Sequence, residues 1–356
     1  MKSNEKTKVF VGVSGGVDSS VSAALLQKEG YDVTGVFIRT WSPEFIECTW
    51  RDERRDAIRV CAHLEIPFLE LDAEDAYKTA VADYMIAEYR AGRTPNPDVM
   101  CNREIKFGVF WNFAREHGAD YIATGHYARN ENGNLKCAPD ESKDQSYFLW
   151  KLRADDLSHI LFPIGHLPKT EVRKLAEKFG LPTASKKDSQ GVCMLGDLDI
   201  KQFLTHYIEP VRGDVLDESG TVIGYHDSAV FLTLGERHGF TITKKTPEDE
   251  RYYIVAKDTE KNTITVSHRS DLCEPAGQTQ MVIAETNWIS EVPEASKKYD
   301  CQIRYHGERI PCTLLLGNRA SMSAEIIFEK PVLASAGQSI VIYDSDVCIG
   351  GGIITA

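Results

Sequence analysis

Apolar residues recur along this chain in two patterns, one after the other. In the first part, short runs rich in β-branched and aromatic residues alternate with segments whose apolar positions repeat every three to four residues. The runs at 9–13, 32–38, 68–72 and 121–124 predict buried strands, and the segments between them predict helices. Strand and helix in alternation predict an α/β fold, a doubly wound parallel sheet with helices on both faces.

One predicted helix shows the repeat clearly. Ala57, Val60, Cys61 and Leu64 lie at positions i, i+3, i+4 and i+7 and therefore share one face. We expect this face to be buried, which makes Cys61 a core residue.

The pattern changes from about Gly213. Glycine turns and alternating β-branched residues replace the helical repeat, and six or so short strands follow Pro275. Short strands of this kind are typical of a compact barrel or sandwich. We therefore expect an α/β domain at 1–205, a small β-rich domain at 206–272 and a further β domain at 273–356.

Composition and charge narrow the class of protein. The chain has 356 residues and a net charge of −12, which argues against a general nucleic-acid binder, although a local basic patch can still hold an RNA. Its nine cysteines include no C-x-x-C pair, which argues against a disulfide framework and a zinc site. A polar start and the lack of a long apolar run predict a cytoplasmic protein that does not cross a membrane.

The strongest local signal is the turn between the first predicted strand and helix. Residues 12–20 read Gly-Val-Ser-Gly-Gly-Val-Asp-Ser-Ser. Glycines let main-chain N–H groups approach an anion, and hydroxyls and a helix dipole add to the attraction for phosphate. We expect Ser19 or Ser20 to cap the helix. Asp18 adds a carboxylate that could place a magnesium ion carried in with a nucleotide.

For a glycine pair alone, an ordinary strand-to-helix turn is the alternative. The patterns G-x-x-x-x-G-K-[ST] and G-x-G-x-x-G are both absent. Residues 14–19 instead resemble the PP-loop of the ATP pyrophosphatases, enzymes that split ATP between its α and β phosphates and adenylate a substrate oxygen. The resemblance points to adenylating chemistry and leaves the substrate open.

Three other features are candidates for chemistry. The segment 92–102 contains two prolines, which predict a rigid loop rather than a helix or central strand. His126 follows a predicted strand at the same sheet edge as the glycine turn, although a structural hydrogen-bonding role is commoner for a lone histidine. Cys193 follows two lysines, which lower the pKa of a thiol, but a buried core cysteine is the alternative.

Further motifs extend the resemblance over the whole chain. They are Asn96-Pro97-Asp98, Cys101-Asn102, Ile105-Lys106-Phe107, Thr124-Gly125-His126-Tyr127, Lys143-Asp144-Gln145-Ser146, Asp188-Ser189-Gln190-Gly191-Val192-Cys193, Gly235-Glu236-Arg237-His238-Gly239 and Ala336-Gly337-Gln338. In this order they resemble the tRNA-specific 2-thiouridylase family. The resemblance implies a PP-loop domain, a small middle domain and a C-terminal β-barrel that contacts tRNA. It also implies ATP-dependent transfer of sulfur to carbon 2 of the wobble uridine, with Mg2+ accompanying ATP and a cysteine desulfurase or relay protein as the persulfide donor.

The resemblance assigns roles to individual residues. Those that would hold ATP are Gly12, Val13, Ser14, Gly15, Gly16, Val17, Asp18, Ser19, Ile38 and Gly125. Those that would surround the target uracil are Asn96, Pro97 and Asp98, with Asp98 as acid or base. Cys101 would be the nucleophile and Cys193 the persulfide carrier, and the two would form a disulfide during the catalytic cycle. Those that would contact tRNA are His126, Lys143, Asp144, Gln145, Arg304, Tyr305 and Gln338.

Two functions of other kinds stay open at this point. One is a different adenylating ligase of the same loop class, acting on a small carboxylate or on citrulline, whose cysteines would be structural. The other is a non-catalytic tRNA-binding or redox-sensing protein in which Cys101 and Cys193 form a regulatory disulfide. A product whose formation depends on thiol would distinguish the thiouridylase from the ligase. Pyrophosphate release that requires ATP and tRNA would exclude the non-catalytic protein.

Overall fold

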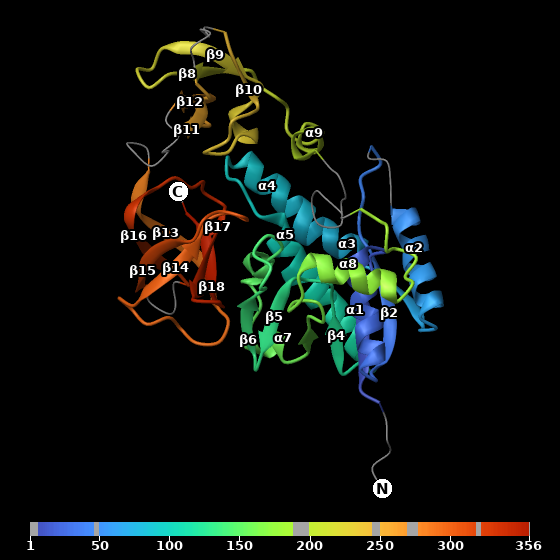
Figure 1. Ribbon diagram of the computed structural model, residues 1–356. Coiled ribbons are helices and arrows are strands. Elements are labelled where there is room, and N and C mark those ends of the chain that lie inside the picture. The colour runs from blue at the N-terminus through green and yellow to red at the C-terminus, as the bar shows by residue number, and fades with distance from the viewer. Residues whose placement is uncertain are drawn as a thin grey trace.

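The described residues of the chain fold around three β-sheets (Figure 1). The computed structural model describes residues 6–45, 50–187, 199–243, 250–268, 277–317 and 322–355. In Figure 1 the α/β part runs from blue to green, the middle domain is yellow, and the barrel is orange to red. Cys193 and the rest of its motif lie outside the described residues.

The first sheet is parallel throughout and has the strand order β3-β2-β1-β4-β7. Its strands are β1 (Lys8–Gly12), β2 (Asp32–Arg39), β3 (Phe68–Asp72), β4 (Tyr121–Ala123) and β7 (Ile160–Leu161). The order reverses between β1 and β4, and doubly wound sheets bind ligands beyond the carboxyl ends of the two strands at such a point. We call this edge of the sheet the crevice. The predicted doubly wound sheet is confirmed.

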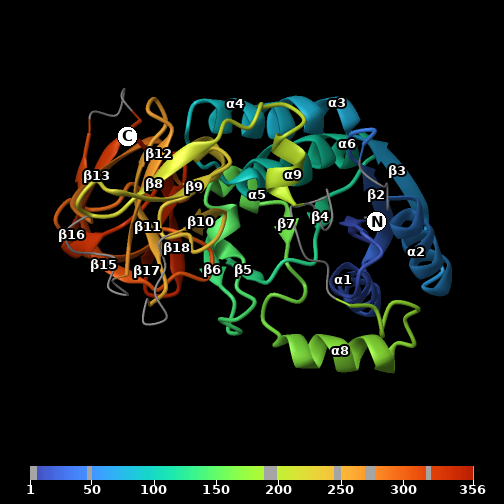
Figure 2. The same cartoon turned by 90° about the horizontal axis from the view of Figure 1, so that it is seen from above.

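Helices cover both faces of this sheet. The helical segments of this part of the chain are α1 (Val17–Lys28), α2 (Trp50–His63), α3 (Glu74–Tyr77), η1 (Lys78–Asp83), α4 (Tyr84–Arg90), α5 (Pro97–Met100), η2 (Cys101–Val109), α6 (Phe110–Glu116), η3 (Ser146–Leu149), α7 (Ala154–Leu157), α8 (Lys169–Lys178) and α9 (Ile200–Leu204). Val9 and Val11 of β1 pack with α1 and α2, whereas Phe10 points to the opposite face, toward η2 and α6. Figure 2 shows α1 and α8 on one side and α3, α4 and α6 on the other. Cys61 is 1% exposed in the core, as predicted.

The prediction of an irregular loop over 92–102 is wrong for its second half. α5 begins at Pro97 and continues directly into η2, a π-helical segment, and then into α6. Proline is well suited to the first helical position, because its missing N–H has no partner there and its fixed φ matches the helix. Only residues 93–96 keep the irregular conformation.

The middle domain is a five-stranded sheet with the order β10-β9-β8-β12-β11. Its elements are β8 (Gly213–Leu216), β9 (Val222–His226), η4 (Ala229–Phe231), β10 (Phe240–Ile242), β11 (Tyr253–Asp258) and β12 (Thr263–Ser267). β8 and β12 pair in parallel, and the other pairs are antiparallel. The prediction that this part of the chain is rich in β-strands is confirmed.

The C-terminal domain is a closed antiparallel barrel, as the resemblance implied. Its strands are β13 (Gln278–Trp288), β14 (Lys298–Gln302), β15 (Ile310–Leu316), β16 (Ala324–Val332), β17 (Ser339–Asp344) and β18 (Val347–Ile354). Pairing of β13 with β18 closes the ring. Among the described residues, no helix has the length and apolar character needed to span a bilayer.

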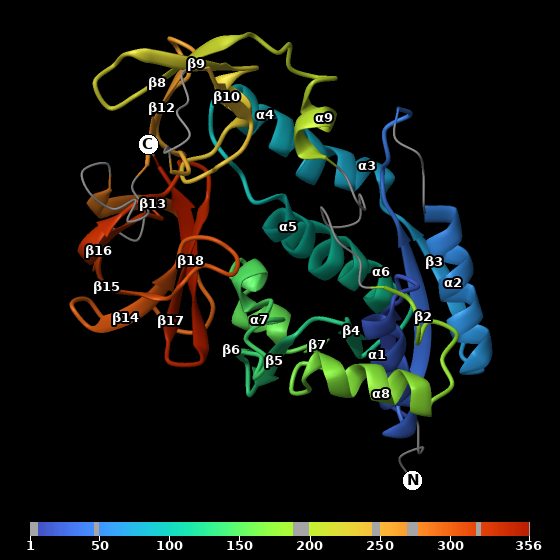
Figure 3. The same cartoon turned by 45° about the horizontal axis from the view of Figure 1, so that its top comes forward.

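A hairpin of the α/β part joins the barrel. Its strands, β5 (Ala128–Glu131) and β6 (Asn134–Cys137), extend the barrel sheet through the pair Lys136 and Val347. The views in Figures 1 and 3 agree that the hairpin lies between the barrel and the parallel sheet. Tyr147 and Trp150 each donate a hydrogen bond to Ser339 at 3.0 Å, so the two parts also share a buried core. The sequence did not predict this connection.

Candidate functional site

The predicted phosphate-binding turn lies at the crevice, between the end of β1 and the start of α1. Gly15 has φ +70°, and a Cβ there would lie 2.4 Å from the main-chain oxygen of Glu53. Only glycine is compatible with both the backbone conformation and this close approach. α2 therefore fixes the shape of the turn from outside.

Hydroxyl groups hold the turn from inside. The Ser14 N–H donates to Ser19 Oγ at 3.2 Å, and the two hydroxyl oxygens are also 3.2 Å apart. The predicted capping by Ser19 or Ser20 is wrong, because α1 starts earlier, with Gly16 as its N-cap and no side-chain cap. Ser20 lies within the helix, and its hydroxyl donates back to the Gly16 carbonyl at 2.6 Å.

The expected adenosine contacts border the same crevice. A Cβ on Gly125, just beyond β4, would lie 2.7 Å from the Ser19 nitrogen and 2.8 Å from the Asp18 carbonyl carbon. Ile38 lies on β2, two residues beyond Val36, which pairs with Gly12. The fold thus brings Gly125 against the turn and places Ile38 near the carboxyl end of the strand next to β1.

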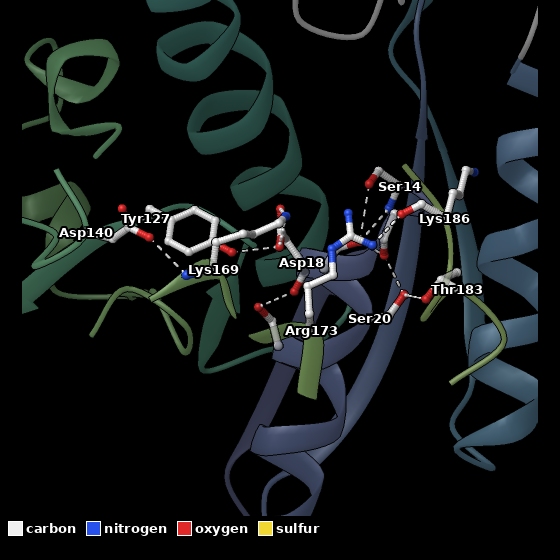
Figure 4. A network of polar contacts seen from close by, with 12 residues as sticks. Ser14, Asp18, Ser20, Tyr127, Asp140, Lys169, Arg173, Thr183 and Lys186 are labelled. Atoms are coloured by element: carbon white, nitrogen blue, oxygen red, sulfur yellow. Dashed lines mark hydrogen bonds and ion pairs between the residues drawn. The ribbon is translucent and has the colours of Figure 1, made fainter. Parts of the chain in front are cut away.

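Asp18 is already engaged by other side chains (Figure 4). Lys169 Nζ donates to its two carboxylate oxygens at 2.7 and 2.8 Å, and the Tyr127 hydroxyl donates to it at 2.9 Å. The Lys169 main-chain N–H donates in turn to Asp140 at 3.0 Å. Sequence reasoning missed Lys169, because it lies far along the chain in no motif of its own.

A second lysine approaches the turn from the α2 side. Lys186 Nζ donates to the Gly15 carbonyl at 3.0 Å and to Asp56 at 2.8 Å. Burial alone would raise the pKa of Asp56, but Lys186 and Arg59 outweigh it and lower this pKa. Arg173 of α8 donates to the carbonyl of Lys186 at 2.5 Å and so ties this region to α8.

The predicted nucleophile and base-binding residues lie on α5 and just before it. Cys101 is fully buried at the junction of α5 and η2, one helical turn after Asp98. Asp98 is partly exposed, and its charge adds to burial and to Asp144 in raising the Tyr305 pKa. Asp98 and Cys101 thus share one rigid helical turn.

The barrel anchors the segment that precedes this turn. The Ser339 N–H donates to the Asn96 side-chain oxygen at 2.7 Å, and the Thr94 N–H donates to the Ala336 carbonyl at 2.8 Å. Gly337 has φ +90°, and a Cβ there would lie 2.9 to 3.0 Å from atoms of Arg93 and Thr94. The conformation of residues 93–96 therefore depends on a chain segment more than 200 residues away.

His126 lies in a buried polar network and is 6% exposed. Its Nδ1 is 2.7 Å from the Thr124 hydroxyl, and its Nε2 is 3.1 Å from Asn102 Oδ1 and 3.4 Å from Lys106 Nζ. Burial, with the nearby Lys106 charge, lowers the His126 pKa well below its ordinary value, so the ring is neutral. These contacts favour the structural role that the sequence left as the alternative to a tRNA contact.

The Lys143–Gln145 loop is fastened to the segment that follows β4. The Gln145 side-chain oxygen accepts from the Tyr127 N–H at 3.0 Å, and the Asp144 carboxylate accepts from the Ala138 N–H at 2.8 Å. Lys143 is partly exposed. The Gln145 amide and the Asp144 carboxylate therefore shape the loop, and Lys143 is the cation that the loop carries.

The predicted tRNA-contacting residues of the barrel lie in two places. Tyr305 packs on Phe148 of the α/β part with ring centroids 4.4 Å apart, and Arg304 beside it is exposed. Burial, with help from Asp144 and Asp98, raises the Tyr305 pKa to about 12. Gln338 accepts from the Ser335 N–H at 3.2 Å and lies next to the Gly337 contact.

The chain on both sides of the Cys193 motif is anchored near the crevice. On one side, Lys186 bonds the phosphate-binding turn. On the other side, His206 stacks on Phe45 with ring centroids 3.6 Å apart, and Phe203 of α9 packs on Trp41. Phe45 and Trp41 follow β2, at the carboxyl edge of the parallel sheet. The predicted Cys101–Cys193 pairing involves a residue outside the described part of the chain.

Known proteins resemble this chain along its whole length. Residues 7–197 match the tRNA methyl transferase HUP domain family, 201–268 the tRNA methyl transferase PRC-barrel domain family and 278–354 the aminomethyltransferase beta-barrel domain family. The chain is 42% identical over 361 residues to the tRNA-specific 2-thiouridylase MnmA of Geobacillus thermodenitrificans (strain NG80-2), covering 99% of this chain and 96% of the relative. It is 40% identical over 367 residues to MnmA of Enterococcus faecalis (strain ATCC 700802 / V583), with the same coverage. The solved U34-tRNA thiolase NcsA from Methanococcus maripaludis is 21% identical over 57% of this chain and 65% of its own, but its TM-score of 0.37 does not establish a shared fold.

Proposed function

Since the chain belongs to the tRNA-specific 2-thiouridylase family, we propose that it uses ATP to replace the oxygen at carbon 2 of the wobble uridine of tRNA by sulfur. The observation that carries the proposal is the identity of about 40% to relatives of that name over 99% of the chain. A cytoplasmic location, where tRNA and ATP are both present, is part of the proposal.

The chemistry requires activation before substitution. The C2 carbonyl of uracil is a poor electrophile, and its oxygen does not leave as hydroxide near neutral pH. Attack of that oxygen on the α-phosphate of ATP would release pyrophosphate and leave AMP attached to it. AMP then departs when sulfur attacks C2.

The crevice supplies groups suited to the first step. Main-chain N–H groups of residues 15–19, the Ser14 and Ser19 hydroxyls and the N-terminus of α1 would hold the phosphates. The absence of a side chain at Gly125 lets the chain pass close to Asp18 and Ser19. Main-chain groups of Gly125 and Ile38 would contact the adenosine. Asp98 would act as the acid or base on the uracil, with Asn96 and Pro97 beside it.

The residues around Asp18 do not fit a resident metal site. Its two carboxylate oxygens accept hydrogen bonds from Lys169, and the described residues contain no group of three or more His, Cys, Asp or Glu that could hold a metal ion. Magnesium bound through ATP phosphates is compatible with this arrangement.

Sulfur delivery would use two thiols. A persulfide on Cys193 receives its outer sulfur from a donor protein, a cysteine desulfurase or a relay protein. The Cys101 thiolate attacks the inner sulfur of that persulfide, which forms a Cys101–Cys193 disulfide and releases sulfide to attack C2. A thiol reductant then restores both cysteines. Because Cys101 is fully buried, its thiol reacts only with a partner brought next to it inside the protein.

The tRNA would lie across the α/β part and the barrel. Lys143 and Arg304 offer cations for phosphate, and Tyr305 offers an aromatic edge to the splayed bases of an anticodon loop. Asp144, Gln145 and Gln338 would act mainly by holding the loops that carry these groups. For His126 we propose the same positioning role, since its ring is buried.

The test is mass spectrometry of nucleosides from tRNA incubated with the full chain, ATP, magnesium and a persulfide source. The protein is expected to produce 2-thiouridine together with one pyrophosphate per modified base. Cys193→Ser is expected to abolish 2-thiouridine while leaving ATP binding intact. Cys61→Ala, at a core cysteine with no part in the proposed steps, is the matched control and is expected to stay active.

Each of the other functions predicts a different result. Normal thiolation by Cys193→Ser would contradict the proposed sulfur chemistry. An adenylated small molecule formed without thiol would indicate a ligase. Absence of pyrophosphate release in the presence of ATP and tRNA would indicate a binding or sensing protein.

A further inference from the structure

The phosphate-binding turn lacks positive charge of its own. Residues 12–19 contain one charged side chain, Asp18, and no lysine or arginine. A Walker-type loop carries a lysine that reaches the β and γ phosphates, and this turn has none. A side-chain cation for the phosphates of a nucleotide must therefore come from elsewhere in the chain.

Lys169 brings a cation to this turn from 151 residues further along the chain. Its ammonium lies 2.7 and 2.8 Å from the two oxygens of Asp18, in the first turn of α1. Its side chain is 13% exposed and its nitrogen lies 5.7 Å from the Tyr127 ring centroid. Figure 4 shows Lys169 and Tyr127 converging on Asp18 from the same side.

The backbone of Lys169 is also fixed. Its N–H donates to Asp140 at 3.0 Å, and α8, which it opens, packs on α1 through Val172 and Ala176. A lysine held at both its backbone and its ammonium loses little further freedom when it binds a ligand. Such a group is preorganised for an anion at the start of α1.

Lys186 has different partners. Its ammonium bonds the Gly15 carbonyl and Asp56 of α2. Because one partner of Lys186 is a backbone carbonyl of the turn, we infer that this lysine maintains the shape of the turn. Lys169 instead neutralises the one carboxylate that would repel a phosphate there.

We propose that Lys169 binds the β and γ phosphates of ATP, with Asp18 and Tyr127 as the positioning residues that hold its ammonium at the turn. The role rests on the proposed function, since it presupposes that ATP is the substrate. In this arrangement Asp18 acts through Lys169, and the turn obtains from α8 the charge that a Walker loop carries within itself.

The experiment compares the affinities of the full chain for ATP and AMP by calorimetry. Lys169→Gln keeps a hydrogen-bond donor to Asp18 but removes the charge. It is expected to weaken ATP binding about 10- to 100-fold, the range for loss of a charge-assisted bond, and to change AMP affinity less than about 2-fold. AMP lacks the β and γ phosphates, so a purely structural role would weaken both nucleotides alike.

Two further variants complete the design. Lys174→Gln, on the same helix but with a side chain 71% exposed, is the control and is expected to bind ATP as the parent does. Asp18→Asn tests the Lys169–Asp18 pair by changing the carboxylate instead of the ammonium. This test remains available if Lys169→Gln does not fold. It is expected to lose a similar share of ATP affinity, with the Mg2+ concentration for half-maximal ATP binding unchanged within about 2-fold.

The outcomes separate this role from the proposed function. Equal loss for ATP and AMP in Lys169→Gln, or no loss for either, would overturn the role of Lys169. A shift of about tenfold in the Mg2+ requirement of Asp18→Asn would assign Asp18 to the metal instead. Failure of the parent protein to prefer ATP over AMP would count against the proposed function itself.

Discussion

The phosphate-binding turn and residues 93–101 reach their conformations by different means. The turn is shaped by its own glycines and serines and by the helices and strands of the parallel sheet next to it. Residues 93–96 take their conformation from the barrel, through Ser339, Ala336 and Gly337. The nucleotide half of the site is therefore built within one sheet and its helices, whereas the base-binding half depends on the docking of another domain.

This difference predicts that substitutions separate ATP use from tRNA use. A change confined to the turn is expected to affect nucleotide affinity first. A change at the barrel contact is expected to leave ATP binding intact and weaken tRNA modification.

The largest effect is expected for Cys101→Ser. Loss of the nucleophile is expected to lower the thiolation rate on the order of 10³-fold or more, without a change in ATP affinity. The measurement is single-turnover formation of 2-thiouridine, with Cys61→Ala as the control. A rate within tenfold of the parent would contradict the role of Cys101.

Gly125→Ala is expected to damage the nucleotide half. The new Cβ would lie 2.7 Å from the Ser19 nitrogen, and backbone atoms of α1 would have to move. A displacement of this size is expected to lower kcat/KM for ATP about 100-fold, measured as tRNA-dependent pyrophosphate release. Gly30→Ala, just beyond the other end of the same helix, has no atom within 4 Å of its Cβ but a φ of +95°, so it is a control that carries backbone strain without a clash. Equal effects of the two substitutions would argue against a nucleotide beside Gly125.

Gly337→Ala is expected to damage the base-binding half. Its Cβ would press on Arg93 and Thr94 at 2.9 to 3.0 Å, and its φ of +90° adds strain. We expect KM for tRNA to rise about tenfold, equivalent to about 1.4 kcal/mol, with KM for ATP unchanged. Gly118→Ala is the control, because Gly118 has a similar φ of +80° but no atom within 4 Å of its Cβ. It therefore measures the backbone strain without the clash. A rise in KM for ATP of the same size would show that the two halves are not separable.

The smallest effect concerns pH. Burial lowers the His126 pKa in the folded protein, so below about pH 6.5 the unfolded chain takes up a proton that the folded chain does not. The free energy of unfolding is then expected to fall by up to about 1.4 kcal/mol per pH unit as the pH decreases. Urea unfolding of His126→Gln is expected to lack this slope, and His117→Gln, at an exposed histidine, is expected to keep it. An unchanged slope in His126→Gln would contradict a neutral buried ring.

Local patterns account for what the sequence predicted. Apolar runs and helical spacing predicted the strands and helices of the sheet and the burial of Cys61, because each depends on residues close together in the chain. The glycine and serine turn was predictable for the same reason. The helix at Pro97 was missed because proline breaks a helix interior but favours a helix start, and the composition of the segment does not say which position it occupies.

Long-range pairs account for what was missed. The bonds of Lys169 to Asp18 and of Ser339 to Asn96 join residues 151 and 243 positions apart. Neither has a local signal, because a lysine at a helix start and a serine at a strand start are unremarkable alone. The resemblance assigned roles to residues 96–98 and 338, but it did not predict that their segments are in contact.

The pairing of the β5–β6 hairpin with β18 has a consequence for synthesis. Lys136 can pair with Val347 only after Val347 has left the ribosome, about two hundred residues later. At 5–20 residues per second this is a delay of roughly 10 to 40 s. Over that interval the growing polypeptide exposes an unpaired strand edge. The first half of the site can form during translation, but the second half can be completed only after the last strand has emerged. Incomplete products of translation are therefore expected to bind nucleotide before they can engage an RNA.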